Sequence, residues 1–143
     1  MFDNIGIGRR KMTYGNNEVL LIVDDDTDVL RILTMMLRSA GYRVIEASSP
    51  AEALKLVSDV IDQIDLVITD MIMPGMNGKS LASKLKTLRS DIKVLFISGY
   101  GDDVMKTLNI DLTNCHFAQK PLDFAVLTSL INNILTTPTE GNT

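Results

Sequence analysis

The sequence contains few cysteines and no long apolar run. Its 143 residues include a single cysteine, Cys115, which excludes an internal disulfide and a multi-cysteine metal site and favours a reducing, cytoplasmic location. No apolar run reaches the roughly eighteen residues that a membrane helix needs. The basic residues Arg9, Arg10 and Lys11 are not followed by the apolar segment of a signal peptide. Neither secretion nor membrane insertion is therefore expected.

A surplus of positive charge is also lacking. The chain has 14 Lys and Arg against 18 Asp and Glu, a net charge of -4 at pH 7. Contacts to nucleic-acid phosphates need Lys and Arg gathered on one face, so direct nucleic-acid binding is not expected. Only four prolines and nine glycines occur among 45% hydrophobic residues, which is typical of a globular chain.

The chain divides into one domain with a tail at each end. Residues 1–17 show no sustained hydrophobic period and end in Gly-Asn-Asn, so we interpret them as an N-terminal tail or linker remnant. Residues 137–143 are polar and form a second expected tail. The intervening residues 18–136 have a length typical of one domain.

Within this domain, short apolar runs alternate with segments of helical period. This alternation predicts an α/β fold in which strand and helix units surround a parallel sheet. The expected strands cover residues 19–23, 43–46, 65–69, 94–97 and 115–119. Five helices are expected, over residues 27–39, from a Ser49-Pro50 start, around Leu81 to Leu88, over residues 102–108, and around Leu127 to Ile134.

Polar residues stand where four of these strands end. They are Asp24 to Asp26 after the first strand, Asp70 after the third, Ser98 after the fourth and Lys120 after the fifth. In an open parallel sheet the ligand crevice lies outside the carboxyl ends of the strands. The four positions are therefore expected to converge on one pocket.

The chemistry of this pocket points to phosphoryl transfer. Clustered carboxylates repel one another unless a cation joins them, and an all-oxygen ligand set suits Mg²⁺. Mg²⁺ and the Lys120 ammonium could together neutralise charge on a transferring phosphoryl group. A carboxylate between them would be the phosphoryl-accepting nucleophile.

Four motifs carry a resemblance to a known family. They are residues 21–26 (LIVDDD), residues 65–78 (DLVITDMIMPGMNG), residues 97–100 (ISGY) and residues 119–121 (QKP). Over about residues 19 to 135 the sequence resembles the chemotaxis-regulator-like receiver domain of two-component response regulators. The resemblance implies a flavodoxin-like, doubly wound, five-stranded parallel sheet in the order 2-1-3-4-5 with five helices.

The resemblance also implies a role for each site residue. Asp70 would be the phosphoacceptor and an Mg²⁺ ligand, Asp25 a direct ligand, and Asp24 a ligand through water. The backbone carbonyl of Ile72 would complete the protein ligands. Ser98 and Lys120 would stabilise the phosphoryl group, and Phe117 would be the aromatic residue that changes position on activation.

The function implied is signalling. A histidine kinase or histidine phosphotransfer protein would phosphorylate Asp70, and the surface of helix four, strand five and helix five would report this to a downstream protein target. The domain would not be an enzyme beyond assisting its own phosphorylation and dephosphorylation. The sequences around Ser98 and Lys120 also resemble receivers at the C-terminus of hybrid sensor histidine kinases. The chain is therefore either a free-standing regulator or a domain excised from a larger protein.

Other interpretations of the same residues exist. Asp24 and Asp26 could open a haloacid-dehalogenase-like aspartyl phosphatase, although Asp102 and Asp103 here precede Lys120 whereas that family places its lysine first. A degenerate receiver that binds partners without phosphorylation is the third alternative. Taken one at a time, the residues also allow purely structural interpretations. Asp24 to Asp26 could cap the helix that follows, and Phe117 could be an ordinary core residue.

Overall fold

The computed structural model describes residues 15–99, 114–120 and 122–138. Its centre is a parallel sheet whose strands run in the order β2-β1-β3-β4-β5, which confirms the predicted fold class and strand order. The strands are β1 (Val19–Val23), β2 (Arg43–Ala47), β3 (Leu66–Asp70), β4 (Val94–Ser98) and β5 (Cys115–Gln119).

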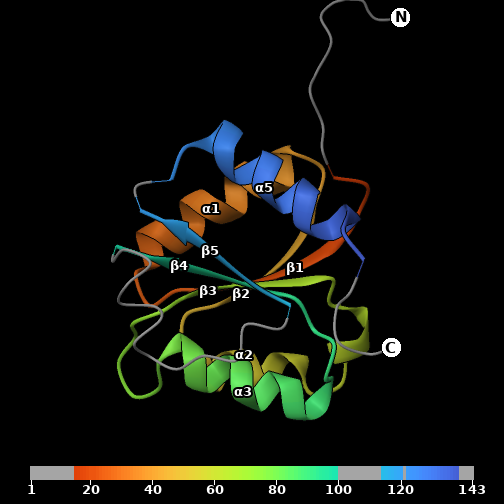
Figure 1. The fold of residues 1–143 in the computed structure, drawn as a ribbon. Coiled ribbons are helices and arrows are strands. Elements are labelled where there is room, and N and C mark those ends of the chain that lie inside the picture. The colour runs from red at the N-terminus through yellow and green to blue at the C-terminus, as the bar shows by residue number, and fades with distance from the viewer. Residues whose placement is uncertain (1–14, 100–113, 121, 139–143) are drawn as a thin grey trace, which may run out of the picture.

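Helices cover both faces of the sheet. Figure 1 shows α1 (Thr27–Ser39) and α5 (Phe124–Thr136) on one face, with α2 (Pro50–Val57) and α3 (Gly78–Leu88) on the other. The helix expected over residues 102–108 lies outside the described residues. A short 3-10 helix, η1 (Ile61–Gln63), follows α2 and was not predicted. In the described part of the chain, no helix is long and apolar enough to cross a membrane.

The central strands are apolar because both of their faces are covered. Every residue of β1 and of β4 is buried, as expected for parallel strands between two helical layers. One cluster of buried side chains, which includes Leu21, Val67 and Phe96, lies on the side of α2 and α3. A second, which includes Leu20 and Ile68, joins the sheet to α1 and α5.

The third strand begins one residue later than the sequence predicts. The prediction gave residues 65–69, but β3 spans Leu66–Asp70. Asp65 still contacts β1, because its N–H donates to Val19 O at 2.8 Å and its side-chain Oδ2 accepts a hydrogen bond from the Val19 N–H at 2.8 Å. Asp65 thereby joins the beginnings of β1 and β3, a contact that periodicity does not reveal.

The helices begin at side-chain caps. Asp26 accepts hydrogen bonds from the first-turn amides of α1, and Ser49 accepts one from the Glu52 N–H at the start of α2, followed by Pro50 as predicted. Asn77 and Asp123 cap α3 and α5 in the same way. These caps satisfy backbone donors that a helix leaves unpaired in its first turn.

Candidate functional site

The candidate site lies at the carboxyl edge of the sheet, where the strand order places several chain segments side by side. Asp24 follows the last residue of β1, Asp70 is the last residue of β3, Ser98 ends β4 and Lys120 follows β5. Strands β1, β3, β4 and β5 are consecutive neighbours. The predicted convergence of these residues is therefore a direct result of the topology.

Three carboxylates form the acidic part of the site. One carboxylate oxygen from each of Asp24, Asp25 and Asp70 lies within 4.8 Å of the others. Asp24 is buried, Asp70 is half-buried and Asp25 is exposed. Negative charge is thus concentrated at a point that solvent reaches from the side of Asp25.

The surroundings of Asp24 change its acidity. Burial raises its pKa above the ordinary value, and the neighbouring charges of Asp70 and Asp25 act in the same direction. A hydrogen bond from the Asp26 N–H to Asp24 Oδ1, at 2.9 Å, and the Lys120 ammonium oppose this pKa rise. The net effect is a pKa of Asp24 above its ordinary value, so this carboxylate is easier to protonate than an exposed aspartate.

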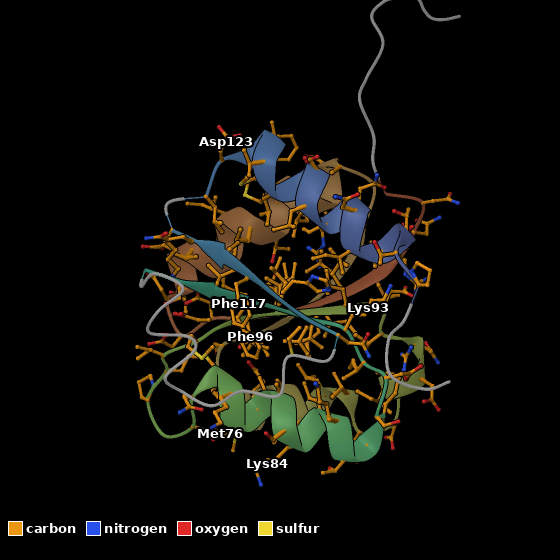
Figure 2. The ribbon with its side chains drawn as sticks, in the orientation of Figure 1. Met76, Lys84, Lys93, Phe96, Phe117 and Asp123 are labelled. Atoms are coloured by element: carbon orange, nitrogen blue, oxygen red, sulfur yellow. The ribbon has the colours of Figure 1, made fainter. Side chains whose placement is uncertain are left out.

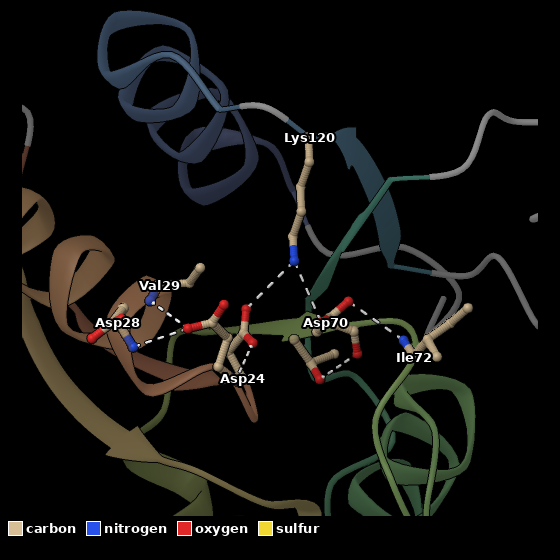
Figure 3. A network of polar contacts seen from close by, with 8 residues as sticks. Asp24, Asp28, Val29, Asp70, Ile72 and Lys120 are labelled. Carbon is tan, nitrogen blue, oxygen red and sulfur yellow. Dashed lines mark hydrogen bonds and ion pairs between the residues drawn. The ribbon is translucent and has the colours of Figure 1, made fainter.

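Lys120 reaches across the edge to two of the carboxylates. Its Nζ lies 3.4 Å from Asp70 Oδ2 and 3.8 Å from Asp24 Oδ2 (Figure 3). A hydrogen bond from the Lys120 N–H to the Ser98 carbonyl oxygen, at 2.8 Å, positions its backbone. The ammonium therefore partly compensates the charge of the acidic cluster from the side of β5.

The acidic run after β1 serves both interpretations that the sequence left open. The side chain of Asp26 caps α1, with Oδ1 accepting from Asp28 N at 3.0 Å and from Val29 N at 3.2 Å (Figure 3). Asp24 and Asp25 instead belong to the acidic cluster. Capping and cluster formation are therefore divided among consecutive residues.

The loop after β3 holds Asp70 against the start of α3. Asp70 Oδ1 accepts a long hydrogen bond from the Ile72 N–H at 3.4 Å, and the Gly78 N–H donates to Met71 O at 2.8 Å. A side chain on Gly78 would overlap the Asp70 carbonyl oxygen. Gly75 turns the loop with a φ of 84°, a left-handed conformation that glycine adopts at little cost.

Ser98 and Phe117 complete the predicted set. Ser98 is buried beside Lys120 at the end of β4. Phe117 lies three residues before Lys120 and stacks on Phe96 of β4, with ring centroids 5.5 Å apart. Phe96 was not among the predicted site residues, because its contact depends on the register between β4 and β5.

The residues present are chemically suited to Mg²⁺. All the candidate ligand atoms are oxygens, and within the described residues the three clustered carboxylates have one lysine, Lys120, paired with them, which leaves negative charge for a hard cation to neutralise. The exposed position of Asp25 keeps one side open to water, which Mg²⁺ retains when bound to proteins.

An apolar groove borders the site. Its volume is about 450 Å³, and its lining residues are Val29, Ile32, Leu33 and Met36 of α1 together with Lys120 and Leu122. The carboxylates do not line this groove, so the acidic cluster and the groove are adjacent features that share Lys120.

Comparison with known proteins identifies the family. The model of the response regulator receiver domain matches residues 20–132, and the chain belongs to that family. It is a phosphoacceptor signalling domain of the two-component kind.

Individual relatives agree with this assignment. The sensor kinase CckA of Brucella abortus is 34% identical over 122 residues, which are 85% of this chain and 13% of the kinase. Sporulation initiation phosphotransferase F of Bacillus subtilis is 31% identical over 120 residues, 83% of this chain and 94% of that protein. The solved receiver domain of the hybrid histidine kinase CckA superimposes with a TM-score of 0.72 at 33% identity, covering 82% of this chain and 99% of that domain. The chain thus spans a small part of the kinase and nearly all of the two single-domain matches.

Proposed function

We propose that Asp70 accepts a phosphoryl group from a phosphorylated histidine in a Mg²⁺-dependent reaction. The donor is a histidine kinase or a histidine phosphotransfer protein, and the unit that carries the reaction spans residues 18–136. The observation that supports this most is the position of Asp70, half-buried at the end of β3 between the Lys120 ammonium and two further carboxylates.

The residues divide the chemistry among them. An Asp70 carboxylate oxygen attacks phosphorus, the bond from phosphorus to the donor nitrogen breaks, and an acyl phosphate forms on Asp70. Lys120, already 3.4 Å from Asp70 Oδ2, pairs with the phosphoryl oxygens. Ser98 donates its hydroxyl to the same group. Phosphoryl transfer needs mainly such positioning and charge stabilisation.

Asp24, Asp25, Asp70 and the Ile72 carbonyl oxygen would hold Mg²⁺, with Asp24 acting through water. When bound, Mg²⁺ supplies positive charge beside the phosphoryl oxygens and relieves the repulsion among the carboxylates. Burial raises the pKa of Asp24, and a cation bound beside it would act in the opposite direction by stabilising the ionised form.

The phosphorylated domain then signals to a downstream protein through the surface that includes β5 and α5. The rest of that predicted surface, the helix expected over residues 102–108, lies outside the described residues. A single cysteine, Cys115, in the 143 residues supports a reducing, cytoplasmic location.

The test uses acetyl phosphate, a small acyl-phosphate donor. Incubation with acetyl phosphate and Mg²⁺ should add one phosphoryl group that is labile in base, measured by intact-mass spectrometry. Asp70→Asn should abolish the addition, whereas Asp62→Asn, at an exposed position in η1, should label like the wild type. Equal labelling of the Asp70 variant would assign the nucleophile elsewhere.

A further inference from the structure

Three side chains form a row across the sheet from the acceptor to Phe117. The strand register pairs Thr69 of β3 with Phe96 of β4, and Phe96 with Phe117 of β5. Thr69 directly precedes Asp70, and its hydroxyl donates to the Asp70 carbonyl oxygen at 3.0 Å. The row therefore begins at the backbone of the acceptor and ends on an aromatic ring of β5, with Phe96 in the middle.

Phe96 is the fixed member of the aromatic pair. Its side chain is fully buried at 0% exposure, whereas Phe117 is half-buried. The two ring planes are inclined by only 22°, a stacked arrangement of the kind that aromatic pairs favour. Figure 2 labels the two residues on the neighbouring strands β4 and β5. Because closely packed core side chains have little room to move, Phe96 offers a constant surface for the more exposed ring.

Phe96 also shares a face of its strand with Ser98. Residues two apart in a strand point to the same side of the sheet, and both side chains are buried. Phe96 therefore lies on the same face as Ser98, the residue proposed to bind the phosphoryl group, and directly beside Phe117, the residue that the resemblance to receiver domains predicts to change position.

We propose that Phe96 is a positioning residue, which by stacking favours the Phe117 rotamer of this structure and so sets how readily Phe117 changes rotamer on phosphorylation. This inference depends on the proposed function for its role in signalling. Movement of the Phe117 ring away from its present place breaks the stack. Loss of the ring at position 96 therefore shifts the equilibrium toward the rotamer adopted in the phosphorylated protein. A stack of this type is sufficient to change a two-state ratio by about two- to tenfold.

The experiment measures the χ1 rotamer populations of Phe117. Three-bond couplings from the backbone nitrogen and carbonyl carbon to Cγ report χ1, and they do not depend on the ring current of residue 96. They would be recorded without phosphate and again with Mg²⁺ and beryllofluoride, a phosphoryl mimic. Phe117→Leu assigns the signal among the four phenylalanines of the chain.

Phe96→Leu removes the ring but keeps an apolar side chain. It should shift the resting Phe117 populations about two- to tenfold toward the rotamer that the wild type adopts with beryllofluoride. Phe96→Met should give an intermediate shift because sulfur also contacts aromatic rings favourably. If Phe96→Leu does not fold, the proposal is tested with Phe96→Met alone. Ile97→Val is the matched control, since it truncates the next buried residue of β4, which belongs to the other core cluster, and it should leave the populations unchanged.

Several results would overturn the proposal. They are wild-type populations in Phe96→Leu and Phe96→Met, an equal shift in Ile97→Val, or a wild-type rotamer that is the same with and without beryllofluoride. Phosphorylation of Asp70 is measured separately by mass. A protein that is not phosphorylated would refute the proposed function, while the resting rotamer populations would still decide whether Phe96 holds Phe117.

Discussion

Asp24 is a single residue whose position favours cation binding but lowers the stability of the folded protein. A buried carboxylate beside two others is unfavourable in a folded protein unless cations compensate it. Lys120 compensates only in part, because its Nζ is 3.8 Å from Asp24 Oδ2 and also contacts Asp70. The raised pKa of Asp24 reflects this imbalance.

Asp24→Asn should therefore stabilise the metal-free protein at pH 7 by about 1 kcal/mol, the common size of a single-site effect. Folding raises the pKa of Asp24 above its ordinary value of 3.8, so the folded state binds more protons than the unfolded state between the two pKa values. The contribution of Asp24 to the free energy of unfolding consequently falls as the pH rises through this window. The variant's advantage should disappear below pH 3.8.

Urea unfolding in the presence of a chelator, at a series of pH values, measures this difference. Asp62→Asn provides the control for loss of a negative charge at an exposed position. An Asp24→Asn variant that is less stable than the wild type at pH 7 would contradict the argument.

At the scale of the elements, the loop between β3 and α3 contains two glycines that are required for different physical reasons. Gly78 lies against the Asp70 carbonyl oxygen with no room for a side chain, whereas Gly75 has open space around it but a φ of 84°. Gly99, after β4, meets neither restriction among the described residues: apart from its chain neighbours, none of their heavy atoms lies within 4 Å of the position that its Cβ would occupy.

Alanine substitutions at these three positions should rank accordingly. Gly78→Ala should cost about 2 kcal/mol of unfolding free energy because backbone must move, and it should slow phosphorylation by displacing Asp70. Gly75→Ala should cost about 1 kcal/mol from its left-handed backbone alone, and Gly99→Ala should be close to neutral. Chemical denaturation measures the series, and equal losses at positions 78 and 99 would contradict the steric argument.

Lys93 joins the beginning of β4 to the end of α5. Its Nζ donates to the carbonyl oxygens of Ile134, at 2.8 Å, and of Thr137, at the end of α5, where a helix has few backbone donors of its own to offer. The Ile134 oxygen also accepts the Thr137 N–H, at 3.3 Å. Burial lowers the pKa of Lys93, and Asp65 opposes that shift. The lysine thus supplies positive charge where the helix dipole is negative.

Lys93→Met should consequently destabilise the protein by about 1 kcal/mol and speed amide hydrogen exchange in the last turn of α5. Phosphorylation by acetyl phosphate should be unchanged, since Lys93 lies at the opposite end of β4 from Ser98. Lys84→Met, on the exposed surface of α3, controls for the loss of a lysine. Unaltered exchange in α5 would contradict the capping role.

The sequence predicted what depends on local pattern and missed what depends on register. Apolar runs located the strands, and the cap at Ser49 with Pro50 located the start of α2. Asp65 was predicted to lie in β3, and its hydrogen bond to Val19 was not predicted. That bond joins residues 46 positions apart in the sequence, which a local pattern does not reveal. The contacts of Phe96 and Lys93 were missed for the same reason, since each joins segments whose alignment no periodicity reports.

For the molecule as a whole, the site and the described chain ends lie at opposite edges of the sheet. The carboxylates and Lys120 occupy the carboxyl edge. At the other edge, the Gly15 N–H donates to Ala40 O at 2.7 Å, and Lys93 caps α5. A five-residue strand spans about 17 Å, so phosphorylation reaches the far edge only through changes transmitted along or across the sheet.

Mg²⁺ binding should therefore stabilise the whole fold while disturbing only one edge of it. At a Mg²⁺ concentration of about 100 times the dissociation constant, the free energy of unfolding should rise by about 2.7 kcal/mol, because the ion binds the folded state. Amide NMR shifts should be confined to residues near Asp24, Asp70 and Lys120, leaving Gly15 and Gly41 unaffected. Asp25→Asn should require a higher Mg²⁺ concentration for the same stabilisation, since it removes a carboxylate ligand while keeping the fold. Identical Mg²⁺ dependence in Asp25→Asn and the wild type would show that Asp25 is not a ligand, and a stability independent of Mg²⁺ would refute a site at this edge.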